Sequence, residues 1–149
     1  MTLKRCMPPA GSDDARLLIL GSLPGEASLA AQRYYAHPQN QFWRLIGRAL
    51  GEELGALPYE ERLARLAARR IALWDVVGEA RRDGSLDGSI RGATPNRLAD
   101  FVATHQNLRA IGFNGQTAAR LGRAALGTSG ALQLIDLPSS SPAYTLPFD

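Results

Sequence analysis

Short apolar runs alternate along this chain with longer segments in which apolar residues recur at helical spacing. The runs are rich in leucine and β-branched residues, which is typical of buried strands. Turn-forming glycine, proline and asparagine residues follow several of them. The pattern predicts four strands, at residues 16–20, 71–77, 108–113 and 132–137.

The segments between these runs predict helices at residues 41–50, 59–70, 94–105 and 115–126. In the third of them Thr94 is the expected N-cap and Pro95 the first helical residue, because threonine and proline favour those two positions. Residues 78–92 are polar, charged and rich in glycine, which predicts a long loop.

Strands that alternate with helices indicate βαβ units. We therefore expect an α/β protein, with three layers (α/β/α) around a mostly parallel four-stranded central sheet. The length of 149 residues suits one domain with its own core, so residues 1–149 are expected to form a single domain. No helix is predicted after the last strand, and we expect that the terminal helix of such a domain is missing.

Composition narrows the class further. No apolar run approaches the roughly 20 residues of a membrane helix, and the first residues lack the apolar stretch of a signal peptide, so a cytoplasmic protein is expected. Cys6 is the only cysteine, which excludes an internal disulfide and a cysteine-ligated cluster. We expect it to be a plain thiol near a mobile terminus. The formal charge of +3 is compatible with a nucleic-acid partner without requiring one.

Polar side chains gather after the predicted strands. The carboxyl ends of parallel strands lie on one edge of a sheet, where ligands of open α/β proteins bind. This edge, here named the rim, is expected to present Tyr34, Tyr35, Asn40, Gln41, Asp75, Asn114, Gln116 and Ser139–Ser141. It offers no Ser-His-Asp set and no G-x-S-x-G elbow.

Carboxamides both donate and accept hydrogen bonds. They can read the edge of a nucleobase or hold a water molecule without taking its proton. Aromatic rings can stack on a base that has left the helical stack, and serine-rich loops can approach phosphates. The predicted rim therefore favours a nucleotide or nucleobase ligand.

Three segments carry a resemblance to a known family: G-S-L-P-G at residues 21–25, Y-Y-A-H-P-Q-N-Q-F-W at residues 34–43, and L-P-S-S-S-P-A at residues 137–143. In this order they resemble the signature of the uracil-DNA glycosylase superfamily. The resemblance is closest to its hypoxanthine-DNA (deoxyinosine) glycosylase branch. The mismatch-specific uracil/thymine branch, which shares the H-P-x-N-x-F-W segment, comes next.

One position separates these branches. Mismatch-specific relatives carry a catalytic asparagine between the glycine and proline of the first segment, where this chain has Ser22 and Leu23. In the hypoxanthine branch the asparagine before Phe-Trp is catalytic, which is Asn40 here. The single cysteine disfavours the iron–sulfur branches, and the lack of an acidic residue in the first segment disfavours a further branch.

The resemblance implies that Asn40 orients the attacking water, that Tyr35 stacks on the extruded base, and that Asn114 bonds the base edge. Each has a structural alternative: a loop asparagine that binds its own backbone, a partly buried aromatic, and a helix N-cap. Tyr34 is expected to be packing. Gln41 either orients the catalytic amide or touches the base. Gly21 and Ser22 are expected beside the base, whereas Asp75 faces the pocket or fills a capping role.

The resemblance also implies that Ser139, Ser140, Ser141 and Pro142 grip DNA near the extruded nucleotide, with a polar turn as the alternative. The chain has Tyr144 where relatives often have asparagine, which leaves the contacts after this loop open. Arg81, Arg82 and Arg91 are the arginines that we expect near phosphates.

The implied function is that of a monomeric DNA repair glycosylase without metal or organic cofactor. It would hydrolyse the N-glycosidic bond of a deaminated base, hypoxanthine first and uracil second, and leave an abasic site. No lysine in the matched segments could form a Schiff base, so no linked strand cleavage is expected. Two alternatives remain open: a mismatch-specific uracil/thymine glycosylase and a non-catalytic nucleic-acid-binding α/β module.

Overall fold

A parallel sheet of four strands in the order β3-β2-β6-β7 forms the centre of the computed structural model, which describes residues 2–82, 90–127 and 132–140. The strands are β2 (Leu17–Gly21), β3 (Ile71–Asp75), β6 (Ala110–Asn114) and β7 (Gln133–Leu137). Register places Gly21 beside Asp75 and Asn114 beside Leu137. The polar strand ends therefore share one edge, and the four predicted strands are confirmed within a few residues.

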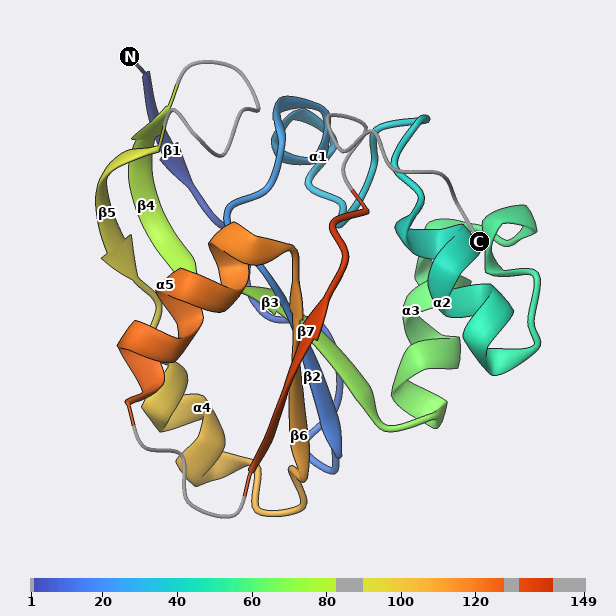
Figure 1. Ribbon diagram of the computed structural model, residues 1–149. Helices are drawn as coiled ribbons and strands as arrows, with labels where there is room; N and C mark the ends of the chain where they lie inside the picture. Colours follow the sequence, from blue (N-terminus) through green and yellow to red (C-terminus); the bar gives the residue numbers. More distant parts are fainter. Residues whose placement is uncertain (1, 83–89, 128–131, 141–149) are drawn as a thin grey trace.

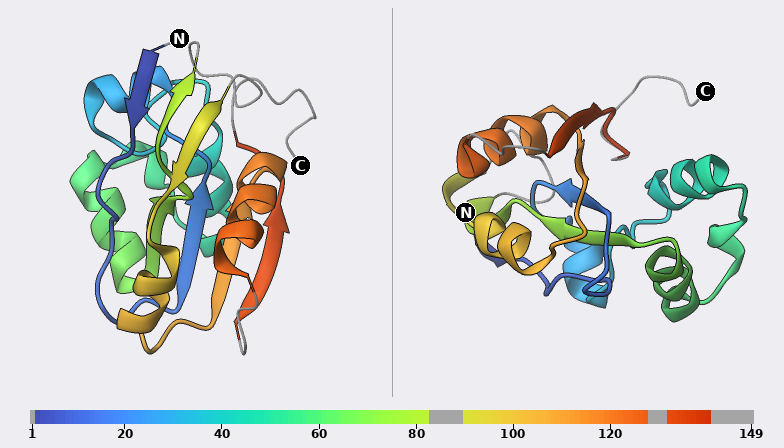
Figure 2. Two further views of the ribbon diagram at one scale, coloured as in Figure 1. Left: turned by 90° about the vertical axis from the view of Figure 1, so that its left-hand side faces the viewer. Right: turned by 90° about the horizontal axis from the view of Figure 1, so that it is seen from below.

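Helices cover both faces of this sheet (Figure 1). On one face lie α2 (Phe42–Leu50), α3 (Tyr59–Ala68) and the short 3-10 helix η1 (Leu54–Ala56); on the other lie α4 (Leu98–Thr104) and α5 (Gln116–Leu126). The view from below in Figure 2 shows the sheet between these two layers, so the predicted three-layer α/β/α class is confirmed. None of the helices in the described ranges is long and apolar enough to cross a membrane.

The alternation of side chains along β2 explains the two layers. Leu18 and Leu20 are fully buried in the cluster that includes Phe101 of α4, whereas Ile19 is buried in the cluster that includes Trp43 of α2. Successive residues of a strand point to opposite faces, so one leucine-rich strand serves two cores.

A second sheet was not predicted. It is antiparallel and consists of β1 (Thr2–Arg5), β4 (Val77–Arg82) and β5 (Arg91–Pro95), in the order β1-β4-β5. The long loop expected at residues 78–92 is therefore wrong in its described parts, while residues 83–89 lie outside the described residues. The strand expected at 71–77 is two strands, separated at Val76. Pairing with the distant N-terminal segment overrides a composition that is locally typical of a loop.

The N-cap expected at Thr94 is also wrong. Thr94 pairs with Glu79, and Pro95 ends β5 at the edge of the second sheet, where no strand needs its missing N–H. Helix α4 begins later, at Leu98. The N-terminal segment that was expected to be mobile is strand β1, so Cys6 follows a paired strand and is half-buried.

Candidate active site

A buried arginine of the second sheet supports the first loop of the rim, at residues 21–25. Arg82 of β4 is fully buried, and its guanidinium donates to the carbonyls of Leu23 at 3.1 Å and Pro24 at 2.5 Å. The carbonyls of Gly21 and Ser22 accept from the N–H groups of Val76 and Val77, where the chain passes from β3 into β4. The expectation that Arg82 contacts phosphates is therefore wrong, because strand alternation points its side chain into the protein.

The second loop is anchored by aromatic residues. Tyr34 is buried and its hydroxyl donates to the carbonyl of Pro8 at 2.7 Å, which agrees with a packing role. The indole N–H of Trp43 donates to the Tyr34 carbonyl at 3.3 Å, and the Ser28 hydroxyl of α1 (Glu26–Ala31) accepts from the Ala36 N–H at 3.0 Å. These contacts fix the chain on both sides of Asn40.

Asn40 is half-buried and stands two residues before the start of α2. Its Oδ1 accepts the N–H of Phe42 at 2.9 Å, and its own N–H donates to the His37 carbonyl at 2.9 Å. The alternative of a loop asparagine bound to its own backbone is thus observed. This hydrogen bond does not use the full hydrogen-bonding capacity of the Asn40 amide, because an amide oxygen has a second lone pair and the nitrogen carries two N–H groups. The hydrogen bond instead fixes the direction in which the amide points.

Asn114 and Ser140 lock two other rim loops together. The Asn114 Nδ2 donates to the Ser140 Oγ at 2.9 Å, and the Ser140 N–H donates to the Asn114 Oδ1 at 2.9 Å. The Ser140 carbonyl also accepts the N–H of Gln41 at 3.0 Å. Asn114 is not the N-cap of α5, which is Gly115. The structure therefore brings together the loops that carry Asn40, Gln41, Asn114 and Ser140.

Tyr35, Asp75 and Gly21 meet where β2 and β3 end. A Cβ on Gly21 would lie 2.6 Å from the Asp75 Oδ1 and 3.4 Å from the Tyr35 hydroxyl. Asp75 is 3 % exposed, so it faces the inside of the site. The Tyr35 ring stacks on Phe42 with centroids 3.9 Å apart, and its backbone is left-handed, with φ of 56°. Such strain in a residue other than glycine is often found at functional sites.

The Tyr35 hydroxyl is buried and has no partner of hydrogen-bond geometry in the part of the chain that the structure describes. Burial raises the pKa of Tyr35 far above its usual value, and the nearby Asp75 carboxylate raises the pKa further, while the Asn114 amide acts in the opposite direction. The hydroxyl is therefore neutral at physiological pH.

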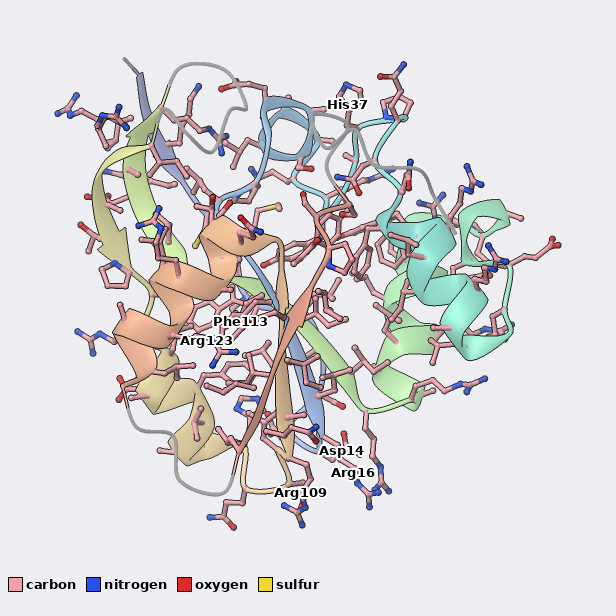
Figure 3. All side chains as sticks on the ribbon, in the orientation of Figure 1. Asp14, Arg16, His37, Arg109, Phe113 and Arg123 are labelled. Carbon is pink, nitrogen blue, oxygen red and sulfur yellow. The ribbon has the colours of Figure 1, made fainter. Side chains whose placement is uncertain are left out.

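Other residues of the rim loops stand apart from this group. His37 is exposed at the rim end of the molecule in Figure 3, and its Nδ1 accepts the N–H of Gln39 at 3.1 Å. Gln116 is exposed on the first turn of α5. Ser139 is half-buried beside Gly115, whereas Ser141 and Pro142 lie outside the described residues. Across residues 2–82, 90–127 and 132–140, no three His, Cys, Asp or Glu side chains cluster as a metal site.

The chain belongs to the uracil DNA glycosylase superfamily. A family model with that description matches residues 8–148, which is nearly the whole chain. The resemblance inferred from the three rim segments is thereby confirmed, and the segments coincide with the loops that meet at the rim.

Curated relatives and a solved structure agree with this assignment. A protein of Methanosarcina acetivorans named hypoxanthine DNA glycosylase is 41% identical over 116 residues, 78% of this chain and 73% of the relative. Its namesake from Methanosarcina barkeri is 39% identical over 113 residues, 76% and 72% of the two chains. A solution NMR structure from M. acetivorans, provisionally described as a uracil DNA glycosylase, superposes with a TM-score of 0.85 at 39% identity. It covers 95% of this chain and 87% of that one.

Sequence reasoning missed the structural role of Arg82 and the proximity of the Tyr35 hydroxyl to Asp75. Strand alternation could have separated Arg82 from its exposed neighbour Arg81, had β4 been recognised. No local signal predicts which residue faces the Tyr35 hydroxyl, because the two side chains come from distant parts of the chain.

Proposed function

We propose that this protein is a DNA repair glycosylase that hydrolyses the N-glycosidic bond of a deaminated base flipped out of DNA and leaves an abasic site. Hypoxanthine is the first candidate and uracil the second. The observation that carries the proposal is that hydrogen bonds join the loops of the rim: Asn114 and the N–H of Gln41 both bind Ser140. Family membership and the names of the two curated relatives support it.

Asn40 is proposed to orient the attacking water. Hydrolysis of this bond passes through a sugar with positive charge at C1′, so a weakly nucleophilic water suffices if it is held in place. The hydrogen bond from Phe42 fixes the Asn40 amide and leaves polar groups free for that water. Water oxygen bonds to C1′, the bond to the base breaks, and the base leaves with the electron pair and takes up a proton.

The rest of the rim is proposed to hold the base and the strand. Asn114 keeps one amide N–H beyond its bonds to Ser140, and this group can stabilise charge on a base oxygen. Phe42 covers one face of the Tyr35 ring, and stacking on the base needs the other face. Gly21, Ser22 and Gln41 are proposed to border the base, and residues 139–142 to contact phosphates.

The proposal is tested at Asn40. Asn40→Ala is expected to lower single-turnover release of hypoxanthine from an inosine-containing oligonucleotide by at least ~100-fold, with DNA binding nearly unchanged. Asn107→Ala is the matched control, because Asn107 is exposed in the turn between α4 and β6, at the other end of the sheet. Full activity of the Asn40→Ala protein would contradict the assignment.

Base preference is decided by a panel of duplexes that hold one inosine, one uracil or one mismatched thymine. Faster release of hypoxanthine supports the proposed branch, and preference for a mismatched pyrimidine supports the alternative. Binding without release of any base identifies a non-catalytic module. Where a base is released, Asn114→Ala is expected to reduce discrimination among bases more than it reduces binding to undamaged DNA.

We further propose a single-domain monomer that acts in the cytoplasm without metal or organic cofactor. The molar mass of the free protein, measured by light scattering, tests whether it is a monomer. Unchanged base release after exhaustive treatment with a chelator tests the independence from metal ions.

A further inference from the structure

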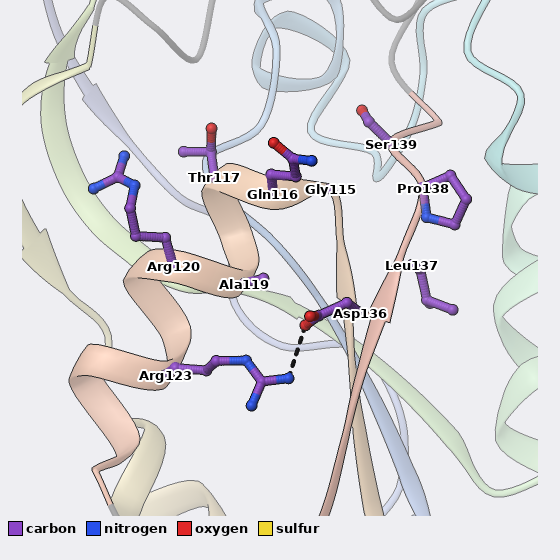
Figure 4. A pocket seen from close by; sticks show the side chains of 10 residues that line it. All are labelled: Gly115, Gln116, Thr117, Ala119, Arg120, Arg123, Asp136, Leu137, Pro138 and Ser139. Atoms are coloured by element: carbon purple, nitrogen blue, oxygen red, sulfur yellow. Dashed lines mark hydrogen bonds and ion pairs between the residues drawn. The ribbon is translucent and has the colours of Figure 1, made fainter. Parts of the chain in front are cut away.

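A groove runs from the rim down the outer side of the molecule, between α5 and the edge strand β7 (Figure 4). Its volume is about 700 Å³. Gly115 and Ser139 line its upper end, and they are the chain neighbours of Asn114 and Ser140, which are hydrogen-bonded to each other. The groove therefore begins where the proposed base site ends.

Two arginines of α5 line this groove, and they differ in their surroundings. The Arg123 guanidinium donates to the Asp136 carboxylate across the groove at 2.8 Å and lies over the Phe113 ring, 5.4 Å from its centroid. Arg120 is exposed and makes no ion pair or side-chain hydrogen bond within the described ranges. In Figure 4 its side chain extends upward to about the height of the first turn of α5, on the side away from β7. Arg120 is thus the cation in the groove that can take a new anion.

The neighbours of Arg120 suit a phosphate group. Gln116 and Thr117 on the first turn of α5 also line the groove and can donate hydrogen bonds. A planar guanidinium binds phosphate oxygens through two parallel N–H groups. Arg120 lies four residues after Gln116 in α5, about one helical turn further on, so both residues are on the same side of the helix.

We propose that the groove between α5 and β7 binds the sugar-phosphate backbone of the DNA strand next to the extruded nucleotide, with Arg120 as the phosphate contact. Asp136 holds Arg123 away from that backbone and limits the number of phosphates that are bound. This inference rests on the proposed function, and it adds a DNA contact outside the three matched segments.

The test compares two exposed arginines. Arg109 is exposed and immediately precedes β6, at the end of the sheet opposite to the rim. It lies near Arg16 and far from the rim in Figure 3. Arg120→Gln is expected to weaken binding to an inosine-containing duplex several-fold at low salt. It should also make the slope of log K against log salt shallower by about 0.9, the loss of one phosphate contact. Arg109→Gln should change neither the affinity nor the salt slope, and it should leave the rate of single-turnover base release unchanged.

A second variant tests the inference in the opposite direction. Asp136→Asn removes the anion that holds Arg123, so it is expected to tighten binding several-fold and to steepen the salt slope by a similar amount. Equal behaviour of Arg120→Gln and Arg109→Gln, or weaker binding by Asp136→Asn, overturns the proposal.

The outcomes separate this inference from the proposed function. One outcome is that the unmodified protein binds DNA and Arg120→Gln reduces the salt slope, but no base is released. The inference that the groove binds DNA is then supported, and the glycosylase assignment fails. If base is released and the two arginine variants bind alike, the glycosylase assignment stands and the groove inference fails.

Discussion

Gly21 is the residue at which the site leaves no room for a side chain. A Cβ there would lie 2.6 Å from the Asp75 Oδ1, so Gly21→Ala must displace a buried carboxylate. We expect a loss of about 1–3 kcal/mol in the free energy of unfolding and a roughly 100-fold loss of base release, because a shift of about 1 Å has that effect in an active site.

Gly55→Ala is the matched control for this prediction. Gly55 lies in η1, and nothing lies within 4 Å of the position that its Cβ would take. Urea unfolding and single-turnover base release should both be close to those of the unmodified protein. Equal behaviour of the two alanine variants would contradict the crowding at Gly21.

Tyr35 and Tyr34 are adjacent but differ in what their hydroxyl groups contact. Tyr34 donates to the Pro8 carbonyl at 2.7 Å, so Tyr34→Phe should cost about 0.5–1.5 kcal/mol at neutral pH. The Tyr35 hydroxyl is buried without a hydrogen-bond partner among the described residues, so Tyr35→Phe should cost little. Urea unfolding at pH 7 distinguishes the two, and a large loss in Tyr35→Phe would contradict the unpaired hydroxyl.

The raised pKa of Tyr35 also predicts a pH dependence. The pKa in the folded state lies above the unfolded value of about 10, so only the unfolded state releases this proton just above pH 10. The contribution to stability is complete below pH 10 and falls as the pH rises, by up to about 1.4 kcal/mol per pH unit. The free energy of unfolding of Tyr35→Phe should therefore fall less steeply with rising pH, in the alkaline range, than that of the unmodified protein. Urea unfolding at several alkaline pH values measures this slope, and equal slopes for the two proteins would contradict the raised pKa of Tyr35.

At the scale of the element, β4 connects the second sheet to the first rim loop. Arg82 is fully buried and donates to the carbonyls of Leu23 and Pro24, whereas Arg81 is exposed. Arg82→Ala leaves two buried acceptors without their donor, at about 1–3 kcal/mol each. We expect a large loss of stability and of base release, while Arg81→Ala should stay within about 0.5 kcal/mol.

Chemical unfolding with base release as a second readout checks this pair of variants. Equal effects of the two substitutions would mean that β4 does not support the loop. Arg82→Lys gives a further comparison, because lysine keeps the charge but loses the planar fork that reaches both carbonyls.

At the scale of the whole molecule, the two faces of the central sheet can be followed separately. Trp43 belongs to the core on the side of α2 and α3, whereas Trp74 packs against the core on the side of α4 and α5. If the chain is a single domain, the variants Trp43→Phe and Trp74→Phe should each show one cooperative transition by fluorescence. That transition should coincide with the loss of far-ultraviolet circular dichroism. Transitions that do not coincide would indicate separate units.

Periodicity predicted the central sheet well because its strands are buried on both faces and carry continuous apolar runs. It failed for β4 and β5, where the sequence between Gly78 and Gly92 is polar and only pairing with β1 produces strands. The same failure misplaced Thr94 and Pro95, whose local preference for a helix start is real but weaker than the pairing of Thr94 with Glu79.

The position of the rim followed from the sequence, because turn and carboxamide residues stand directly after apolar runs, and parallel pairing then requires a common edge. Family membership followed from three short segments, since their order is specific. Tertiary structure alone decided which atoms meet there. It brings Ser140 into hydrogen bonds with both Asn114 and Gln41, and it turns the side chain of Arg82 inward. It also pairs Arg123 with Asp136, while Arg120 makes no ion pair among the described residues. Such contacts join residues far apart in the chain, and packing sets them rather than any local preference of the backbone.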